Sequence, residues 1–159
     1  MRRPGARKRG ITLNQCVLIT GASGFIGSNL AKRILTDEPD TRVIGLDNMN
    51  DYYDVCIKEA RLKELEAFPN YVFVKGNLAD KSLVFDLFET YHPAIVVNLA
   101  AQAGVRYSII NPDAYVESNL LGFYNILEAC RHYPVEHLVY ASSSSVYGAN
   151  KKVPYSTED

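Results

Sequence analysis

The sequence predicts an α/β fold in which a doubly wound parallel sheet is covered by helices on both faces. Short runs rich in β-branched residues alternate along the chain with longer amphipathic stretches, as in parallel strands joined by crossover helices. The run Cys16–Thr20 is almost wholly apolar, which is typical of a strand buried on both faces. A turn with three glycines then joins it to a helical segment. The length of 159 residues suits one domain with a real core.

Five segments have the length and composition of buried strands. They are Cys16–Thr20, Arg42–Leu46, Tyr71–Lys75, Ala94–Asn98 and Glu136–Ala141. Right-handed crossovers place these strands side by side in the order 3-2-1-4-5. In such a sheet, ligands bind outside the carboxyl ends of the strands, at the switch between strands 1 and 4.

Four segments between the strands predict helices. They are Ser23–Thr36, Ile57–Phe68, Lys81–Tyr91 and Pro112–His132. Pro39-Asp40 and Pro69-Asn70 end the first two, and Pro112 lies in the first turn of the fourth, where its missing N–H does no harm.

The fourth helix has an apolar stripe with steps of four and three residues. It consists of Val116, Leu120, Phe123, Leu127 and Cys130. Residues at this spacing share one helix face, and we interpret the stripe as packing against the sheet.

Composition and charge exclude two classes of partner. The chain is 47% hydrophobic and 22% charged, and no apolar run approaches the roughly 20 residues of a membrane span. The net charge of −1 combines five basic residues within positions 1–10 with a charge of −6 over residues 11–159. We therefore expect no membrane and no nucleic-acid partner.

The basic segment predicts a disordered extension over residues 1–13, followed by the folded domain over 14–159. It lacks the apolar core of a secretory signal. The alternative interpretation is that the start of the chain is assigned too far upstream. The role of the tail stays open.

The cysteines favour a cytoplasmic protein without a metal site. Cys16, Cys56 and Cys130 are odd in number, and none has the close spacing of a zinc or redox motif. We expect reduced thiols.

The turn Gly21-Ala22-Ser23-Gly24-Phe25-Ile26-Gly27 is the first candidate binding site. Its glycines allow a tight turn and close approach of the backbone to a pyrophosphate, and the following helix presents unpaired N–H groups to the phosphates. Alone, the motif is equally compatible with an ordinary strand–helix turn. Asp47, twenty residues past Gly27 at the end of strand 2, decides between them.

A carboxylate at Asp47 accepts both ribose hydroxyls and repels a 2′-phosphate. Together with the glycines it predicts NAD as the cofactor, rather than NADP. By itself, Asp47 is equally well interpreted as an acidic loop residue near Asn48.

The G-x-x-G-x-x-G spacing resembles the extended short-chain dehydrogenase/reductase superfamily and its NAD-dependent epimerase/dehydratase family, and the resemblance extends from Val17 to Asp159. It implies a Rossmann-type fold that here stops before strand 6. The cofactor contacts that it implies are Gly21, Ser23, Gly24, Phe25, Ile26, Gly27, Asp47, Asn48, Asn77, Leu78, Leu99, Ala100, Ala101, Asn119 and Ser142. Asn77 stands where the family usually has Asp, which removes a charge near adenine.

Strand 5 ends in the run Ala141-Ser142-Ser143-Ser144-Ser145-Val146-Tyr147-Gly148. Aligned on Val-Tyr-Gly, Ser143 matches the family's catalytic Ser/Thr. Sugar-nucleotide dehydratases and decarboxylases resemble this run but carry a carboxylate at Ser145, often with another acid at Ser144. Because eliminating water needs a general acid and base, the serines favour a 4-epimerase.

Two further segments, Asp47–Asp54 and Gln102–Ser108, look like UDP-glucuronate 4-epimerases. That resemblance implies a UDP-sugar substrate, contacted by Gln102, Arg106, Ser144 and Ser145, although Arg106 reads equally well as a solvated loop residue. It also implies that bound NAD removes hydride from sugar C4 and returns it to the other face of the ketone. Complete enzymes of this kind are expected to be homodimers.

The family's proton carrier is a helical Tyr in a Tyr-x-x-x-Lys motif, in which the Lys lowers the pKa of the phenol. Tyr147–Lys151 has this spacing, but Gly148 and Asn150 are poor helix formers, so we reject it as the catalytic pair. The chain is therefore interpreted as an amino-terminal fragment, without the catalytic base, strand 6 or the substrate domain. Alone, it is expected to fold imperfectly, to bind NAD weakly and not to epimerise.

A stand-alone NAD-binding module without catalysis is the alternative function. The sequence does not decide between UDP-glucuronate and another UDP- or dTDP-sugar, nor does it fix the oligomeric state. It also does not distinguish a true truncation from a gene fragment.

Overall fold

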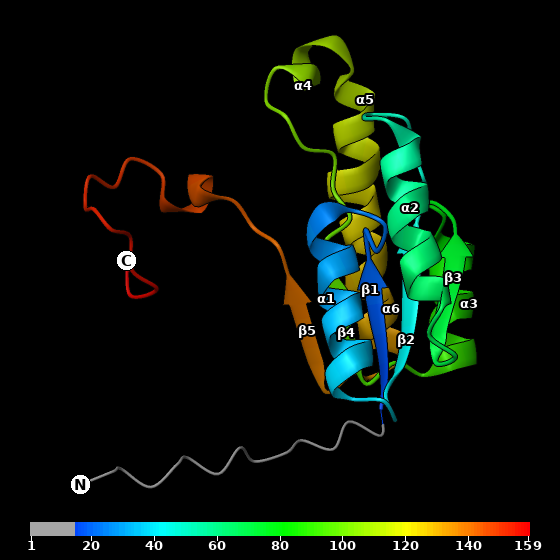
Figure 1. Cartoon of the computed structure of the whole chain (residues 1–159). Helices are drawn as coiled ribbons and strands as arrows, with labels where there is room; N and C mark the ends of the chain where they lie inside the picture. Colours follow the sequence, from blue (N-terminus) through cyan, green and yellow to red (C-terminus); the bar gives the residue numbers. More distant parts are fainter. Residues whose placement is uncertain (1–14) are drawn as a thin grey trace, which may run out of the picture.

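The computed structural model describes residues 15–159, and the extension predicted over residues 1–13 lies outside this range. The described chain forms one parallel five-stranded sheet in the order β3-β2-β1-β4-β5, which confirms the predicted topology. In Figure 1, α1 and α2 lie over one face of the sheet and α3 and α6 over the other.

The strands agree with the predicted segments to within one residue at either end. They are β1 (Cys16–Thr20), β2 (Arg42–Asp47), β3 (Tyr71–Lys75), β4 (Ile95–Asn98) and β5 (His137–Tyr140). β1 is central: its Leu18 lies opposite Ile44 of β2 and Val96 of β4.

The helices that cover the sheet begin at local signals in the sequence. They are α1 (Phe25–Asp37), α2 (Val55–Glu66), α3 (Lys81–Tyr91) and α6 (Phe123–His132). The Asp54 side chain accepts a hydrogen bond from Cys56 N and starts α2, while Asp80 accepts from Leu83 N and starts α3. The side-chain cap at Asp54 explains why α2 begins two residues before the predicted Ile57.

The predicted single helix over 112–132 is in fact three consecutive segments. α5 (Pro112–Tyr115) is followed by a π-helical segment η1 (Val116–Gly122) and then by α6. A π-helix makes i→i+5 hydrogen bonds and turns less per residue than an α-helix, so η1 shifts the phase between the two ends. Gly122 permits close packing there, since a Cβ on it would lie 3.1 Å from Leu78 Cβ.

The expectation that the apolar stripe packs against the sheet is therefore wrong for much of its length. Val116, Leu120 and Leu127 are 55%, 66% and 43% exposed, whereas Ile126 and Ala129 are fully buried. A periodicity of 3.6 assumed across η1 assigns the wrong face to the core.

Two hydrophobic clusters, one on each face of the sheet, form the core. Leu18, Ile44 and Val96 point to the face where Phe88 of α3 and Ile126 of α6 pack. Neighbouring strand residues point to the other face, where they pack with Ala31 and Leu35 of α1 and Leu65 of α2. This alternation explains why the strands are apolar at nearly every position.

Two short helices are absent from the sequence prediction. α4 (Tyr107–Ile110) and the 3-10 helix η2 (Ser144–Tyr147) have four residues each, too few to show a periodicity. Beyond β5 the chain leaves the sheet, and residues 141–159 extend away from the body of the molecule (Figure 1). Among residues 15–159, no helix combines the length and apolar character needed to cross a bilayer.

Candidate functional site: a nucleotide pocket at the carboxyl ends of the strands

The glycine turn between β1 and α1 is closed so tightly that side chains do not fit. Gly21 has φ of +68°, and a Cβ on it would lie 2.9 Å from Ala100 N. A Cβ on Gly27 would lie 2.2 Å from Gly21 O. Gly24 precedes α1, and no side chain caps this helix. The first N–H groups of α1 are therefore free of side-chain acceptors, as an anion-binding helix N-terminus requires.

Asp47, the last residue of β2, is held in place by backbone groups from two loops. Its Oδ2 accepts a hydrogen bond from Ser23 N at 3.0 Å, and its Oδ1 accepts from Met49 N at 2.9 Å. The side chain is only 6% exposed. Each oxygen keeps a further lone pair, so the oriented carboxylate can still accept hydroxyl groups from a ligand.

Lys58 of α2 is a site residue that the sequence did not reveal. Its Nζ lies 2.7 Å from Asn50 Oδ1 and 3.7 Å from Asp47 Oδ1, and its side chain is only 6% exposed. The ammonium group thus joins the carboxylate to the loop after β2. Because α2 is charged on many positions, Lys58 looks like an ordinary surface lysine in the sequence.

The loop after β4 is held against the glycine turn by a buried hydroxyl. Thr20 donates from Oγ1 to Asn98 Oδ1 at 2.7 Å and accepts from the N–H groups of Leu99 and Ala100, each at 3.1 Å. These bonds place the backbone of 99–101 beside Gly21.

A pocket opens where these loops meet, at the carboxyl ends of β1, β2, β3 and β4. Ten residues predicted for cofactor or substrate line it: Gly21, Gly24, Asp47, Asn48, Asn77, Leu78, Leu99, Ala100, Ala101 and Gln102. The other lining residues are Leu46, Asn50, Tyr52, Tyr53, Lys58, Gly76, Ala103 and Ser118. Asn50, Tyr52, Tyr53 and Ala103 lie in the two segments that resemble UDP-glucuronate 4-epimerases, but the sequence assigned none of these eight residues to the site.

Four other residues of the predicted turn support the pocket or flank it. Gly27 is buried beneath the turn, and Phe25 and Ile26 are 72% and 64% exposed on the first turn of α1. Ser23 is fully buried, and its Oγ has no hydrogen-bond partner. An unpartnered buried hydroxyl beside a phosphate-sized turn fits a site that a polar ligand completes.

Asn119 acts on the pocket through the backbone of Gln102. Its Oδ1 accepts from Gln102 N at 2.8 Å, and its Nδ2 donates to Gln102 O at 3.0 Å. Asn119 is not a lining residue itself. Asn77, at the β3 end, donates from Nδ2 to Glu117 Oε1 at 2.6 Å.

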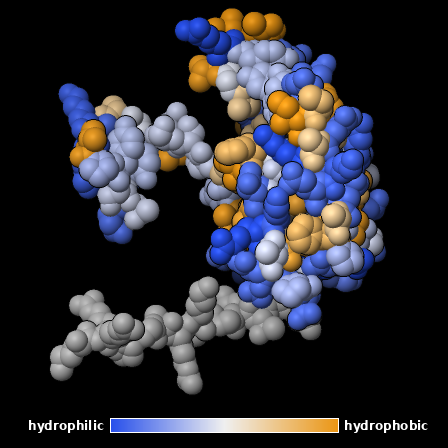
Figure 2. All heavy atoms as spheres, viewed as in Figure 1, coloured by the Kyte–Doolittle hydropathy of each residue, from blue (hydrophilic) through white to orange (hydrophobic). Residues whose placement is uncertain are grey.

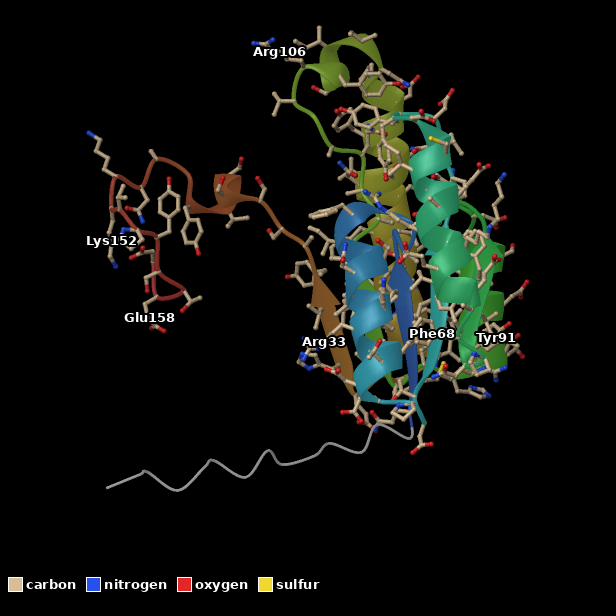
Figure 3. The ribbon with its side chains drawn as sticks, viewed as in Figure 1. Arg33, Phe68, Tyr91, Arg106, Lys152 and Glu158 are labelled. Atoms are coloured by element: carbon tan, nitrogen blue, oxygen red, sulfur yellow. The ribbon has the colours of Figure 1, made fainter. Side chains whose placement is uncertain are left out.

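The serine run and Arg106 lie outside the pocket. Ser142, Ser143, Ser144 and Ser145 are all exposed in the segment that leaves the sheet after β5, and Ser143 Oγ accepts from Ser145 N at 3.2 Å. Arg106 is exposed beside α4 and points away from the body of the molecule (Figure 3).

The Tyr-x-x-x-Lys spacing occurs twice in residues 15–159, and neither occurrence forms an α-helix. Tyr147 ends η2, Gly148 has φ of +57°, and the Tyr147 ring stacks on Tyr155 at a centroid distance of 4.5 Å. A second such spacing, Tyr71–Lys75, forms β3. A strand separates residues four apart by about 13 Å, so the Tyr71 hydroxyl and the Lys75 ammonium are not neighbours.

The fold and the pocket together define a dinucleotide-binding α/β domain. The side-chain-free turn and the uncapped N-terminus of α1 suit a pyrophosphate, and the oriented Asp47 carboxylate suits a ribose. Residues 17–159 match the sequence pattern of the NAD dependent epimerase/dehydratase family, so the chain belongs to this family.

Relatives of known sequence cover almost the whole chain. Protein CapI of Staphylococcus aureus is 52% identical over 90% of this chain and 42% of its own length. UDP-glucuronate 4-epimerase 3 of Arabidopsis thaliana is 48% identical over 90% of this chain and 33% of its own. The chain thus spans less than half the length of these relatives.

Solved structures share the fold. UDP-glucuronic acid 4-epimerase from Bacillus cereus, in complex with UDP-glucuronic acid and NAD, superposes with a TM-score of 0.80 at 30% identity, covering 90% of this chain and 44% of that one. The dTDP-glucose 4,6-dehydratase from Bacillus anthracis, in complex with NAD, gives 0.71 at 29% identity, covering 91% and 43%. Epimerases and dehydratases are both similar in fold, so the fold does not separate these activities.

Proposed function

We propose that this chain is the NAD-binding portion of a nucleotide-sugar 4-epimerase that acts on UDP-glucuronate or a closely related UDP- or dTDP-sugar. The observation that carries the proposal is the pocket in which an oriented, buried Asp47 faces the glycine turn. The similarity to UDP-glucuronate 4-epimerases supports the substrate class.

In this proposal, different pocket residues bind different parts of NAD. Gly21, Gly24 and the N–H groups at the start of α1 hold the pyrophosphate. Asp47 accepts the ribose hydroxyls, and its charge disfavours the 2′-phosphate of NADP. The remaining proposed contacts follow the resemblance: Ser23, Phe25, Ile26, Gly27, Asn48, Asn77, Leu78, Leu99, Ala100, Ala101, Asn119 and Ser142.

The proposed chemistry at the sugar depends on the serine run. Bound NAD would supply the hydride acceptor and donor for sugar C4, and the C4 hydroxyl proton would go to the helical Tyr of the Tyr-x-x-x-Lys motif. Ser143 orients the C4 oxygen, while Gln102, Arg106, Ser144 and Ser145 contact the substrate. A dehydratase needs an acid–base carboxylate near the sugar, and serine at position 145 supplies none. This difference favours epimerisation over dehydration.

Calorimetric titration of the purified chain with NAD and NADP tests the cofactor assignment. We expect NAD to bind more tightly than NADP, and Asp47→Ala to weaken NAD binding by about tenfold or more, since two hydrogen bonds to a charged acceptor are lost. Asp40→Ala, an exposed acid in the loop at the other end of β2, is the matched control and should leave affinity unchanged. Equal NAD affinity in Asp47→Ala and wild type would refute the role of Asp47.

A stand-alone NAD-binding module without catalysis is the second candidate. It is favoured because Tyr147–Lys151 runs from a 3-10 helix into a turn and Tyr71–Lys75 forms a strand, so neither pair has a helical Tyr–Lys arrangement. Incubating the purified chain with NAD and UDP-glucuronate, and separating the UDP-sugars by chromatography, tests the module. We expect NAD binding without turnover from this chain, and measurable conversion would rule out the module.

A homodimer is also part of the proposal, and the exposed members of the apolar stripe on η1 and α6, which are Val116, Leu120 and Leu127, support it. We expect Leu120→Glu to shift the chain toward monomer in light scattering at rising concentration. Lys63→Glu, on exposed α2, is the control. A mass that is the same for wild type and Leu120→Glu at every concentration would contradict pairing through this stripe.

A cytoplasmic location completes the proposal. Cys16, Cys56 and Cys130 are free thiols, and burial raises the pKa of the Cys16 and Cys130 thiols, which keeps them protonated. Unpaired, reduced thiols favour a reducing compartment.

A further inference from the structure

One tyrosine in the lining of the pocket contacts loops from two strand ends. Tyr52 lies in the loop after β2, five residues past Asp47, and lines the pocket together with Gln102 and Ala103 from the loop after β4. Its ring is 44% exposed, so part of it faces the solvent and part faces the protein.

Tyr52 contacts the loop after β4 at its most constrained point. Gly104 has φ of +96°, and a Cβ there would lie 2.3 Å from the Tyr52 hydroxyl oxygen. The Tyr52 ring also packs on the ring of Tyr107, with centroids 5.0 Å apart and planes tilted by 55°. Tilted aromatic pairs at this distance are favourable by about 0.5–1.5 kcal/mol.

The same loop is also held by Tyr115 of α5. The Tyr115 hydroxyl donates to Ala103 O at 2.9 Å and also to Gly104 O. The Tyr107 and Tyr115 rings lie 6.4 Å apart. Residues 103–107 are therefore clamped by Tyr52, from the loop after β2, and by Tyr115, from α5.

We propose that Tyr52 is a positioning residue that couples the nucleotide side of the pocket to the loop carrying Gln102 and Arg106. The loop after β2 is tied to the cofactor site by Asp47, Asn50 and Lys58. A ligand that orders this loop therefore also orders residues 103–107 through the ring of Tyr52. This inference rests on the proposed function, because it takes NAD as the ordering ligand.

Hydrogen–deuterium exchange of the chain, free and with NAD, tests the coupling. The reporters are amides that bond within the clamped loop and α4, such as Tyr107 N to Gly104 O at 3.0 Å and Asn111 N to Tyr107 O at 2.8 Å. In the free chain we expect Tyr52→Ala to raise exchange at these amides about two- to tenfold, the range that loss of an aromatic pair gives. Tyr52→Phe keeps the ring and should retain most of the protection.

Tyr124→Ala is the matched control, because Tyr124 is 50% exposed and lies on α6 away from the pocket. It should leave exchange at residues 104–111 unchanged. Unchanged exchange of these residues in Tyr52→Ala would overturn the proposal. So would faster exchange throughout β1 and β2, since this would mean general unfolding.

Addition of NAD separates positioning from plain packing. In the wild type, NAD should slow exchange both at residues 21–28 and at residues 104–111, whereas in Tyr52→Ala it should slow exchange only at 21–28. Equal protection of 104–111 by NAD in both proteins would overturn the coupling. Absence of NAD binding to the wild type would instead remove the proposed function, and the free-chain comparison would then decide the role of Tyr52.

Discussion

At the scale of single residues, the Tyr71 hydroxyl lies buried beneath the site without a hydrogen-bond partner. It occupies the space where Gly45 has no side chain, since a Cβ on Gly45 would lie 2.2 Å from this oxygen. Burial, and then the negative charges of Asp47 and Glu66, raise the pKa of the Tyr71 phenol. The phenol must therefore stay protonated in the folded chain.

Replacing Tyr71 by Phe removes a polar atom that has no partner. We expect the free energy of unfolding at pH 7 to stay the same or to rise by about 1 kcal/mol, because no hydrogen bond is lost and a desolvation cost disappears. Urea denaturation of Tyr71→Phe and wild type measures this difference. A loss of more than about 1 kcal/mol would mean that the hydroxyl has a partner after all.

The same variant predicts a difference in pH dependence. The pKa of Tyr71 is higher in the folded chain than in the unfolded chain, where it is about 10. The folded state then holds more protons above pH 10, so the stability from Tyr71 is fully present below pH 10 and is lost as the pH rises. Wild type should lose more stability than Tyr71→Phe between pH 9 and pH 11, again measured in urea.

At the scale of secondary structure, the sequence predicted the bounds of a strand or helix correctly where local signals mark both of its ends. β1, β3 and α3 have the predicted bounds, because glycine, proline or Asx residues flank each of them. The helix over 112–132 was not predictable in the same way. Its π-helical segment ends at Gly122, which packs closely against Leu78, a contact between residues 44 positions apart that no local pattern reports.

Two neighbouring residues on α6 test this correction. Ile126 is fully buried, so Ile126→Ala should lower the free energy of unfolding by about 2–5 kcal/mol. Leu127, which the 3.6-residue periodicity assigned to the core, is 43% exposed, and Leu127→Ala should cost less than about 1 kcal/mol. Chemical denaturation measures both, and the reverse order would restore the sequence-based assignment.

At the scale of the whole molecule, the sequence predicted the strand order, the position of the pocket and ten of its lining residues. The strand order and the position of the pocket follow from chirality and from the rule that parallel strands end at the same edge, whereas most of the lining residues follow from the family resemblance. Lys58 could not be predicted, because it reaches the pocket from a helix whose sequence resembles ordinary surface. Tyr52 and Tyr53 lie in the segment Asp47–Asp54 that resembles UDP-glucuronate 4-epimerases, but the resemblance gave them no role in the site. The serine run remains a prediction, since in this structure it extends away from the sheet (Figure 1).

Hydrophobic side chains are exposed at two places in the structure, near α4 and along β5 at the edge of the sheet. Figure 2 shows apolar residues at the top of the view, over α4, where Val105, Ile109 and Ile110 are 87%, 83% and 79% exposed. At the edge of the sheet, Val139 and Tyr140 of β5 are 43% and 53% exposed. Segments with so little packing should open most easily.

Native-state exchange should therefore be graded across the sheet. We expect the slowest amides in β1, β2 and β4, which are paired on both sides, and fast exchange throughout residues 141–159. β5 pairs only with β4 and should fall between them. Uniform protection of β1 and β5 would show that the chain opens only as a whole.

The central place of β1 in the sheet also bears on how the chain is made on the ribosome. β1 pairs with β2 and β4, so the earliest strand within residues 15–159 becomes the one on which the others of the sheet assemble. Every residue that lines the pocket lies between positions 21 and 118. Because domains fold from the amino terminus as they emerge, the nucleotide site is complete before β5 has left the ribosome. A nascent chain can then take up its cofactor while translation continues, and the bound nucleotide would stabilise the half-built sheet by mass action.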